Sequence, residues 1–273
     1  MSPTRVLTAS PVQQDPEILA AFLDNLILQE TNGLVVDYAF VDDNHDARSS
    51  ELLADFSSKH PNTTVVKVPP AQRYHRDENT HHWKDGLIWR VAEFKDALID
   101  HARDGGYDHI FFVDSDIVLR PGTIGHLASL GKDIVSEVFW TSWQPGSPEW
   151  PQVWLRDSYD IVYRRRGEII SAHEEARRAQ EFLDVLRIPG VYEVGGLGAC
   201  TLLSREAMMR GVSFAEIPNL SLNGEDRHFC VRAMAVGLRL HADTHLPPLH
   251  LYRKSDLQRL PHFLAEAGVV AGV

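Results

Sequence analysis

Apolar and polar positions along the chain repeat with the two periods that distinguish helices from strands. Short apolar runs at residues 6–10, 34–41 and 63–68 predict three strands. Between the first two runs, apolar pairs recur with the helical period at Ile18/Leu19, Phe22/Leu23 and Leu26/Ile27. Asp15 is the expected N-cap of that helix and Pro16 its first residue, and residues 47–56 favour a second helix. This β-α-β-α-β order predicts a parallel sheet.

The most apolar run, residues 109–113, leads directly into Asp114-Ser115-Asp116. Such a run is typical of a strand buried on both faces, with the two carboxylates at its C-terminal tip. Their i, i+2 spacing predicts that both lie on one side if strand pairing continues that far. Two close carboxylates repel unless a cation lies between them, and Mg²⁺ or Mn²⁺ holding a diphosphate would suit them. The alternative is ordinary turn chemistry, because Asp frequently starts turns.

Further helices are expected over residues 87–98, 123–130, 171–187 and 225–236, with a terminal helix around 257–264, and further strands over 134–139 and 238–242. In the third of these helices the expected buried stripe is Ala176, Ala179, Phe182, Leu183 and Leu186. In the fourth, the residues expected to face inward are Phe229, Ala233 and Val236.

Two loops have unusual compositions. Residues 70–84 are polar and contain His75, His81 and His82, so they could bind a metal, cover a site as a mobile loop, or simply be solvated. Residues 140–151 contain three tryptophans and three prolines. Tryptophan packs well against sugars, but it also anchors long loops, and both interpretations stay open.

Two shorter motifs come later in the chain. Gly195-Gly196-Leu197-Gly198 precedes an apolar run, which suggests close approach of the backbone to a ligand or an ordinary tight turn. It is not a dinucleotide-binding fingerprint. Asn223-Gly224-Glu225-Asp226 opens a helix. The helix dipole alone favours these acidic residues, and the functional alternative is a general base that projects into a cleft.

Composition narrows the classes of function. The 273 residues suffice for one large α/β domain or two small ones, and 44% are hydrophobic. The net charge of −11 argues against a nucleic-acid-binding surface. Cys200 and Cys230 form no metal motif or disulfide framework and are expected to be buried thiols. Without a signal-peptide core or an apolar run of about 18 residues, the expectation is a soluble, cytoplasmic protein.

Taken in order, these features resemble a nucleotide-sugar-dependent glycosyltransferase of the GT-A fold, similar to family 2. The resemblance rests on the β-α-β-α-β start, Asp42-Asp43 after the second strand, the Asp-Ser-Asp motif, the glycine motif, Glu225-Asp226 and a late histidine. It implies a Rossmann-like, mostly parallel central sheet flanked by helices. The chain would be one domain, with a nucleotide-binding half over about 1–120 and an acceptor-binding half over about 121–273.

The resemblance also implies roles for individual residues. Asp116 would bind the metal directly, Asp114 would bind the ribose or the metal through water, and His250 would complete the metal shell, with His245 as its rival. Asp226 would deprotonate the acceptor if the reaction inverts, and Glu225 would touch acceptor or donor. The implied donor-binding residues are Ser10, Pro11, Val12, Asp42 or Asp43, Arg90, Lys95, Ser115, Gly195 and Gly196. The residues expected to meet the acceptor are Trp140 and Trp143.

The implied cofactor is Mn²⁺ or Mg²⁺, and the implied donor is a UDP-sugar, with GDP-mannose as the alternative. The acceptor would be a sugar or a natural product, nucleic acid is not an expected partner, and a homo-oligomer is compatible with the sequence. Retention of configuration stays open. Three other functions compete: a sugar-phosphate nucleotidyltransferase, a phosphatase of the haloacid dehalogenase kind, and an inactive nucleotide- or carbohydrate-binding module. The first normally has a glycine-rich cationic loop after its first strand, where this chain has Ser10-Pro11-Val12-Gln13-Gln14.

Overall fold

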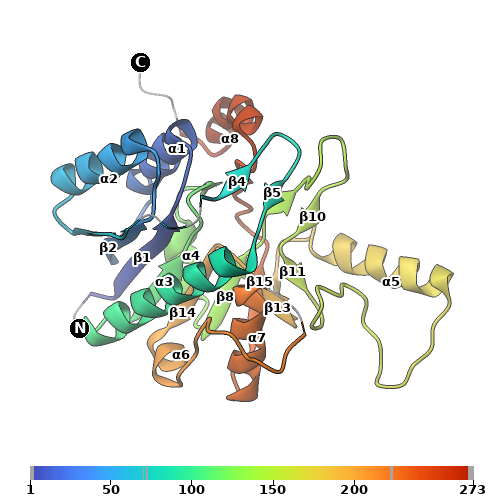
Figure 1. Ribbon diagram of the computed structural model, residues 1–273. Helices are drawn as coiled ribbons and strands as arrows, with labels where there is room; N and C mark the ends of the chain where they lie inside the picture. Colours follow the sequence, from blue (N-terminus) through green and yellow to red (C-terminus); the bar gives the residue numbers. More distant parts are fainter. Residues whose placement is uncertain (1–2, 70, 72, 222–223, 270–273) are drawn as a thin grey trace.

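The computed structural model describes residues 3–69, 71, 73–221 and 224–269 and is built on one eight-stranded sheet (Figure 1). The strand order is β12-β15-β8-β14-β6-β1-β2-β3. The bounds are β1 (Arg5–Val12), β2 (Val35–Asp42), β3 (Thr63–Lys67), β6 (His109–Phe112), β8 (Ile134–Glu137), β12 (Val191–Val194), β14 (Thr201–Ser204) and β15 (Leu240–Asp243). β1, β2, β3 and β6 run parallel, as do β8 and β15, whereas β14 and β12 are antiparallel to their neighbours. The predicted parallel start of the sheet is therefore confirmed.

Helices cover both faces of the sheet. One face packs on α1 (Pro16–Ile27), α2 (Ala47–Lys59) and α4 (Thr123–Ser129), and the other on α3 (Asp85–Asp104), α6 (Arg205–Met209) and α7 (Glu225–Ala235). Successive residues of a strand point to opposite faces, so Val6 joins the first apolar core and Leu7 the second. α1 begins as predicted, because the Asp15 carboxylate accepts a hydrogen bond from Glu17 N at 3.1 Å.

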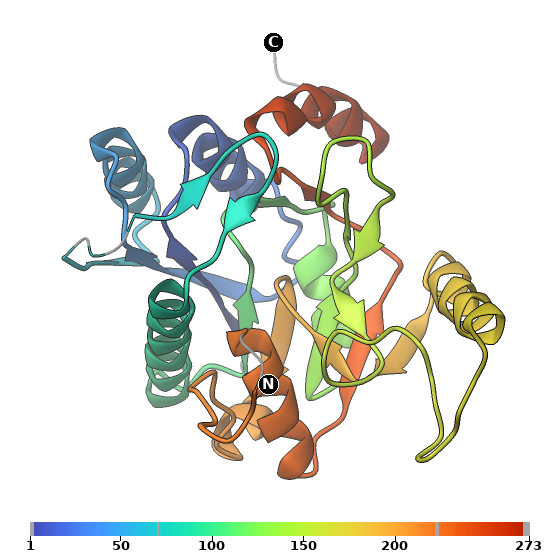
Figure 2. The same ribbon diagram turned by 45° about the vertical axis from the view of Figure 1, so that its right-hand side comes forward.

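Short strand pairs lie at the C-terminal end of the parallel strands. They are β4 (His75–Arg76) with β5 (His81–His82), β7 (Ile117–Val118) with β16 (Leu249–His250), β9 (Trp140–Thr141) with β10 (Trp150–Pro151), and β11 (Val153–Trp154) with β13 (Gly196–Leu197). The histidine-rich loop is thus a hairpin. Figure 2 shows this hairpin (teal) and the segment with β9–β11 (yellow-green) at the same end of the molecule.

The Asp-Ser-Asp motif lies in a turn rather than in a strand. β6 ends at Phe112, and Ile117 N donates a hydrogen bond to Asp114 O at 3.0 Å. The strand pairing therefore does not continue to Asp114 and Asp116, which was the condition for predicting that both lie on one side of a strand. The turn nevertheless brings both carboxylates into one pocket.

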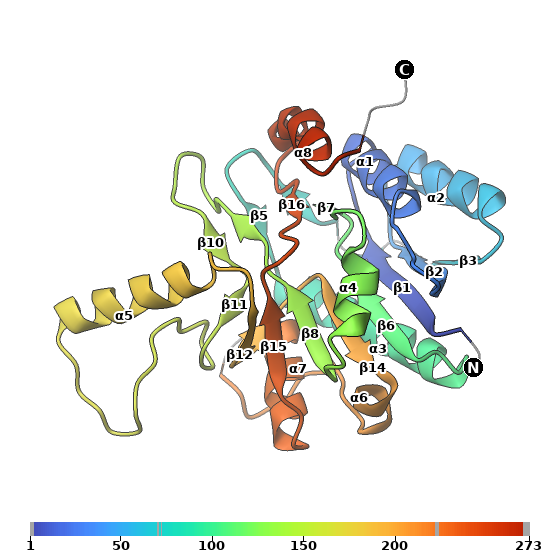
Figure 3. The same ribbon diagram turned by 180° about the vertical axis from the view of Figure 1, so that it is seen from behind.

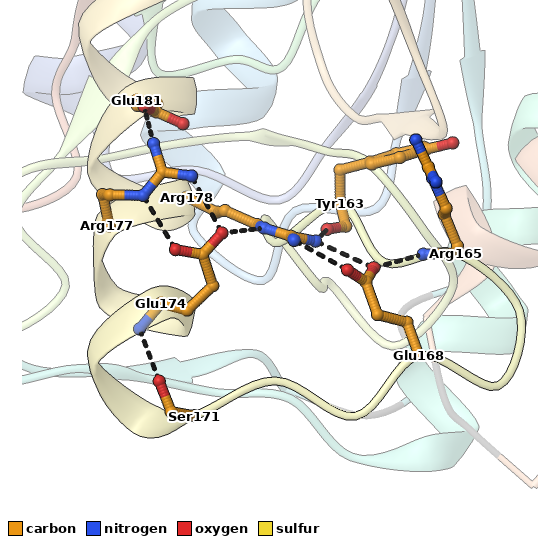
Figure 4. A network of polar contacts seen from close by, with 8 residues as sticks. All are labelled: Tyr163, Arg165, Glu168, Ser171, Glu174, Arg177, Arg178 and Glu181. Atoms are coloured by element: carbon orange, nitrogen blue, oxygen red, sulfur yellow. Dashed lines mark hydrogen bonds and ion pairs between the residues drawn. The ribbon is translucent and has the colours of Figure 1, made fainter.

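An arm containing α5 (Ala172–Val185) extends away from the sheet (Figures 1 and 3). The helix is confirmed, and its predicted buried stripe only in part: Ala176 is exposed, Ala179, Phe182 and Leu183 are half-buried, and Leu186, just beyond the helix, is fully buried. A helix that projects from the body covers little core. Polar contacts hold the arm instead, since Arg178 bonds Glu168 and Glu174, each at 2.7 Å (Figure 4).

The C-terminal segment packs against the start of the chain. Its 3₁₀ helix η1 (Lys254–Arg259) and helix α8 (Leu260–Glu266) bury Phe263 beside Ile18 of α1. The prediction that Val236 faces inward is wrong: α7 ends one residue earlier, and Val236 is 38% exposed. Among the helices described, none combines the length and apolarity needed to cross a bilayer. Pro70 and Asn223, named in the sequence motifs, lie outside the described residues.

Candidate functional site

A pocket of about 750 Å³ opens at the C-terminal ends of β1, β2 and β6. This is the edge of an open α/β sheet at which ligands usually bind. Its wall collects residues from widely separated parts of the chain: the Asp114–Asp116 turn, Lys95 of α3, the Glu225-Asp226 start of α7 and His250 of β16. The structure therefore brings together the residues that the sequence analysis assigned to metal binding and proton transfer.

Two carboxylates and one imidazole meet on the pocket wall. His250 Nε2 lies 3.5 Å from Asp116 Oδ1, and His250 Nδ1 lies 2.7 Å from Thr141 Oγ1. The threonine hydroxyl occupies one ring nitrogen and leaves the other directed at the carboxylate, as in histidines that bind metals. Asp114 lies in the same turn. Carboxylate oxygens and one imidazole are ligand types that Mn²⁺ or Mg²⁺ accepts. The structure pairs Asp116 with His250, whereas the ligand atoms of Asp114, Asp116 and His250 do not all lie within 4.8 Å of one another.

The charges around the turn favour a cation. Burial raises the pKa of Asp114 to about 6, with the charge of Asp116 adding to the effect and Lys95 opposing it. Burial would also raise the pKa of Asp116, but His250, His81 and Arg76 together outweigh it and lower that pKa. Asp116 is therefore the carboxylate that is more readily ionised, which suits direct binding of a metal.

A buried cation joins α3 to α7. Lys95 Nζ lies 3.0 Å from Glu225 Oε1 and 2.9 Å from Asp226 Oδ1. Burial alone would lower the pKa of Lys95, but the carboxylates of Asp226, Glu225 and Asp114 raise it well above its normal value. Lys95 thus keeps its positive charge and orients Asp226 from the side of α3.

Asp226 has the protonation behaviour expected of a general base. Removal from bulk water raises its pKa to about 7, Lys95 opposes this shift, and the charges of Glu225 and Asp114 reinforce it. Its position at the first turn of α7 places the carboxylate at the pocket wall. A carboxylate whose pKa lies near neutrality can accept a proton from a reacting group in the transition state of the reaction and release it to water afterwards.

The opposite end of the pocket is formed by the ends of β1 and β2. Asp43 lines it and is held by a bidentate contact from Arg90, at 2.8 and 3.1 Å, and by Gln13 at 3.2 Å. Arg90 itself does not line the pocket, so its guanidinium positions Asp43 rather than facing a diphosphate. Pro11 and Val12 line the pocket as expected.

Ser10 and Asp42, two of the expected donor-binding residues, lie outside the pocket lining. Ser10 is fully buried, and its hydroxyl donates to Pro11 O. The Asp42 carboxylate accepts hydrogen bonds from Asn44 and Ser50, at 2.7 and 3.1 Å from their side chains. Of the two alternatives Asp42 and Asp43, only Asp43 therefore reaches the pocket.

The glycine motif is divided between packing and the pocket. Gly195 and Gly196 lie outside the lining, and a Cβ there would come within 1.9 Å of Leu155 O and 2.0 Å of the Trp154 ring. They are glycines because the β11 segment packs against their backbone. Gly198 does line the pocket, and a Cβ on it would lie 2.7 Å from Asp226 Oδ2. The close approach predicted from the sequence is thus made by other protein groups.

Aromatic rings form the remaining wall. Trp143 and Trp150 from the β9–β10 loop and Trp154 and Tyr159 beyond it line the pocket. Trp140, which was expected to meet the acceptor, packs instead against the core, with the Arg187 guanidinium 3.6 Å from its ring centroid. Trp140 belongs to the short strand β9 and pairs with Pro151 of β10, whereas Trp143 lies in the loop that follows β9.

The sequence analysis allowed for the histidine-rich loop to cover a site, but it did not predict which of its residues reach the pocket. Tyr74, before β4, and His81, in β5, line the pocket, and His81 stacks on Tyr252 with ring centroids 3.8 Å apart. Burial lowers the pKa of His81 to about 4. The clustering of histidines was the available signal. Its partner Tyr252 is about 170 residues away and was not predicted.

His245, the rival of His250, lies outside the pocket lining. Its Nδ1 atom is 2.9 Å from Asp243 Oδ2 at the end of β15. Of these two histidines, only His250 reaches the Asp-Ser-Asp turn. The metal assignment of His250 stays a prediction, and its geometry favours it over His245.

Comparisons with known proteins agree with the architecture. No protein-family model matches the chain. S. aureus TarS superposes with a TM-score of 0.55 over 99% of this chain at 11% identity, and this chain spans only 40% of it. Its 1–349 fragment gives 0.53 at 11% identity, covering 99% of this chain and 67% of the fragment.

A third structure with a similar fold is the mannosyltransferase PcManGT from Pyrobaculum calidifontis in complex with GDP-Man and Mn²⁺. It has a TM-score of 0.51 and 15% identity, covering all of this chain and 68% of that one. Identities this low establish the fold alone. The predicted fold is thereby confirmed: the chain has the GT-A type of α/β fold, a mostly parallel sheet flanked by helices.

Proposed function

We propose that this chain transfers a sugar from a nucleotide diphosphate sugar to an acceptor hydroxyl with the help of a divalent cation. One observation carries the proposal: a candidate cation site and a candidate general base line the same pocket, joined by Lys95. The fold shared with a mannosyltransferase crystallised with GDP-Man and Mn²⁺ supports it. A UDP-sugar is the favoured donor and GDP-mannose the alternative, with a sugar or natural product as acceptor.

Each part of the pocket has a role in this mechanism. Asp43 and the ends of β1 and β2 bind the nucleoside, and Asp114, Asp116 and His250 hold Mn²⁺ or Mg²⁺. The bound cation supplies a Lewis acid for the diphosphate leaving group. Asp226 accepts the proton of the acceptor hydroxyl, which fits inversion at the anomeric carbon. Rings such as Trp143 pack on the acceptor.

Thermal unfolding in the presence of nucleotide sugars tests the donor assignment. UDP-, GDP-, dTDP- and CMP-sugars are each added with Mn²⁺ or with EDTA. A donor held at about 100 times its Kd stabilises the fold by about 2.7 kcal/mol, and we expect this for one diphosphate donor with Mn²⁺ only. CMP-sugars, which carry one phosphate, are the matched control. The absence of a shift for every diphosphate donor would contradict the proposal.

The pH dependence of transfer tests the base. Below about pH 7 the Asp226 carboxyl holds its own proton and cannot accept another. We therefore expect kcat/KM to rise about tenfold per pH unit up to that point and to level off above it. Excess Mn²⁺ keeps the titration of Asp114 out of the profile. A profile that is flat between about pH 5 and about pH 8 would show that no group of this pKa acts as the base.

A further inference from the structure

A second set of metal-ligating side chains lies outside the pocket, at the ends of β8 and β15 and on α4. His126 Nε2 lies 3.0 Å from Asp243 Oδ1, and His245 Nδ1 lies 2.9 Å from Asp243 Oδ2. One ligand atom from each of the three residues lies within 4.8 Å of the others. In Figure 3, α4 lies against the sheet beside β8, the neighbour of β15.

A fourth potential ligand adjoins this cluster. Glu137 at the end of β8 stands opposite Asp243 in the strand register, and both residues are 0% exposed. Glu137 Oε1 accepts a hydrogen bond from Leu246 N at 2.9 Å, whereas Glu137 Oε2 is buried with no hydrogen-bond donor among the described residues. The Glu137 carboxyl group lies in contact with the carboxyl group of Asp243. Two buried carboxyl groups in contact need either a shared proton or a cation between them.

We propose that His126, Asp243 and His245 bind a divalent cation of the zinc type, with the Glu137 carboxylate available as the fourth ligand. Two imidazoles with carboxylates suit Zn²⁺, whereas the more oxygen-rich turn in the pocket suits Mn²⁺ or Mg²⁺. The imidazole nitrogens that contact Asp243 are the atoms that would bind the ion. A neutral imidazole that carries its proton on the nitrogen next to Asp243 would bind Zn²⁺ there by moving that proton to its other ring nitrogen.

The cation would fix the chain between β15 and β16. This segment begins next to His245 and ends at His250 of the pocket. Thr244 at its start exchanges hydrogen bonds with Gly190, at 3.0 Å in each direction, and farther along Leu246 N donates to Glu137 and Arg120 Nε donates to Pro247 O, at 2.9 and 3.2 Å. An ion bound by Asp243 and His245 would add a further attachment to this segment. The role is structural: it holds the backbone that presents His250.

Zinc binding to the purified, chelator-treated chain tests the site without any sugar donor. The Asp116→Ala background removes the cation site of the pocket, and ZnCl₂ is titrated by calorimetry in two buffers of different ionisation enthalpy. We expect one equivalent of Zn²⁺ to bind, with the same stoichiometry in both buffers. His245→Ala and His126→Ala are each expected to weaken binding at least tenfold. His262→Ala, which removes a histidine that is 81% exposed, is the matched control.

Two outcomes would overturn the proposal. The first is no zinc binding in the Asp116→Ala background, which would leave Glu137 and Asp243 as a proton-sharing pair. The second is binding that survives His245→Ala but is lost in His82→Ala, because His75, Asp77 and His82 form an exposed cluster of similar size on the hairpin. Equal melting temperatures of the metal-free variants show that the fold is intact. Neither outcome depends on the sugar-transfer proposal.

Discussion

Replacement of Asp226 by Asn is expected to leave donor binding intact while slowing sugar transfer about 10³-fold, the contribution typical of a general base. The amide has nearly the shape of the carboxylate but cannot take a proton, and Lys95 keeps Glu225 as a partner at 3.0 Å. The measurements are kcat with a saturating donor and the melting shift that the donor produces. A fall in kcat with an unchanged shift separates proton transfer from binding.

The matched control for this prediction is Asp104→Asn. Asp104 lies at the end of α3 and is 74% exposed. Its replacement by Asn makes the same chemical change outside the pocket lining. Transfer by the Asp226→Asn variant within about tenfold of the unmodified chain would remove Asp226 from the role of base. A lost donor shift would instead assign it to donor binding.

Replacement of Asp116 by Ala is expected to abolish both metal-dependent transfer and the EDTA-sensitive part of the donor-induced melting shift. Stabilisation of the leaving diphosphate by a metal is worth several kcal/mol, so transfer should fall about 10³-fold or more. The fold should persist, because the substitution removes one of two neighbouring negative charges, Asp114 and Asp116, which repel each other. Transfer rates and melting temperatures with and without Mn²⁺ measure both effects.

Asp55→Ala is the control, since Asp55 is a carboxylate 58% exposed on α2 and paired with Lys59. It should behave as the unmodified chain in every assay. Transfer that persists in Asp116→Ala and stays sensitive to EDTA would place the cation elsewhere in the pocket. Transfer that no longer responds to EDTA would show that the reaction needs no metal held by this turn.

The sequence was most informative where one local rule decides the structure. The helical period and the Asp15 N-cap predicted α1, and the apolar runs predicted the parallel strands β1 to β3. The Asp-Ser-Asp turn and the Glu225-Asp226 helix start were recognisable because their order and spacing resemble those of GT-A glycosyltransferases. Their convergence on one pocket then follows from the sheet topology.

The remaining features depend on contacts between distant segments. The family resemblance implied that Arg90 faces a diphosphate, but its partner is Asp43 on another element. Trp140 and Trp143 are three residues apart, and one packs into the core while the other lines the pocket. The stripe on α5 has a helical period, but only its C-terminal end, with Phe182 and Leu186, packs against the core, because the rest of the arm leaves the body of the molecule. No local pattern carries this information.

Gly195 and Gly196 pack against the β11 segment, and this packing divides the aromatic wall of the pocket into two parts. The residues around Trp143 can be substituted singly, whereas Trp154 cannot. Trp154 fits against Gly196 so closely that a Cβ there would lie 2.0 Å from its ring, so neither residue can change size alone. Trp143, in the loop after β9, and Trp150, at the start of β10, are 41% and 39% exposed. If this wall binds the acceptor as proposed, single substitutions at these two positions can change the acceptor preference, whereas change on the Trp154 side requires coordinated replacements in two strands.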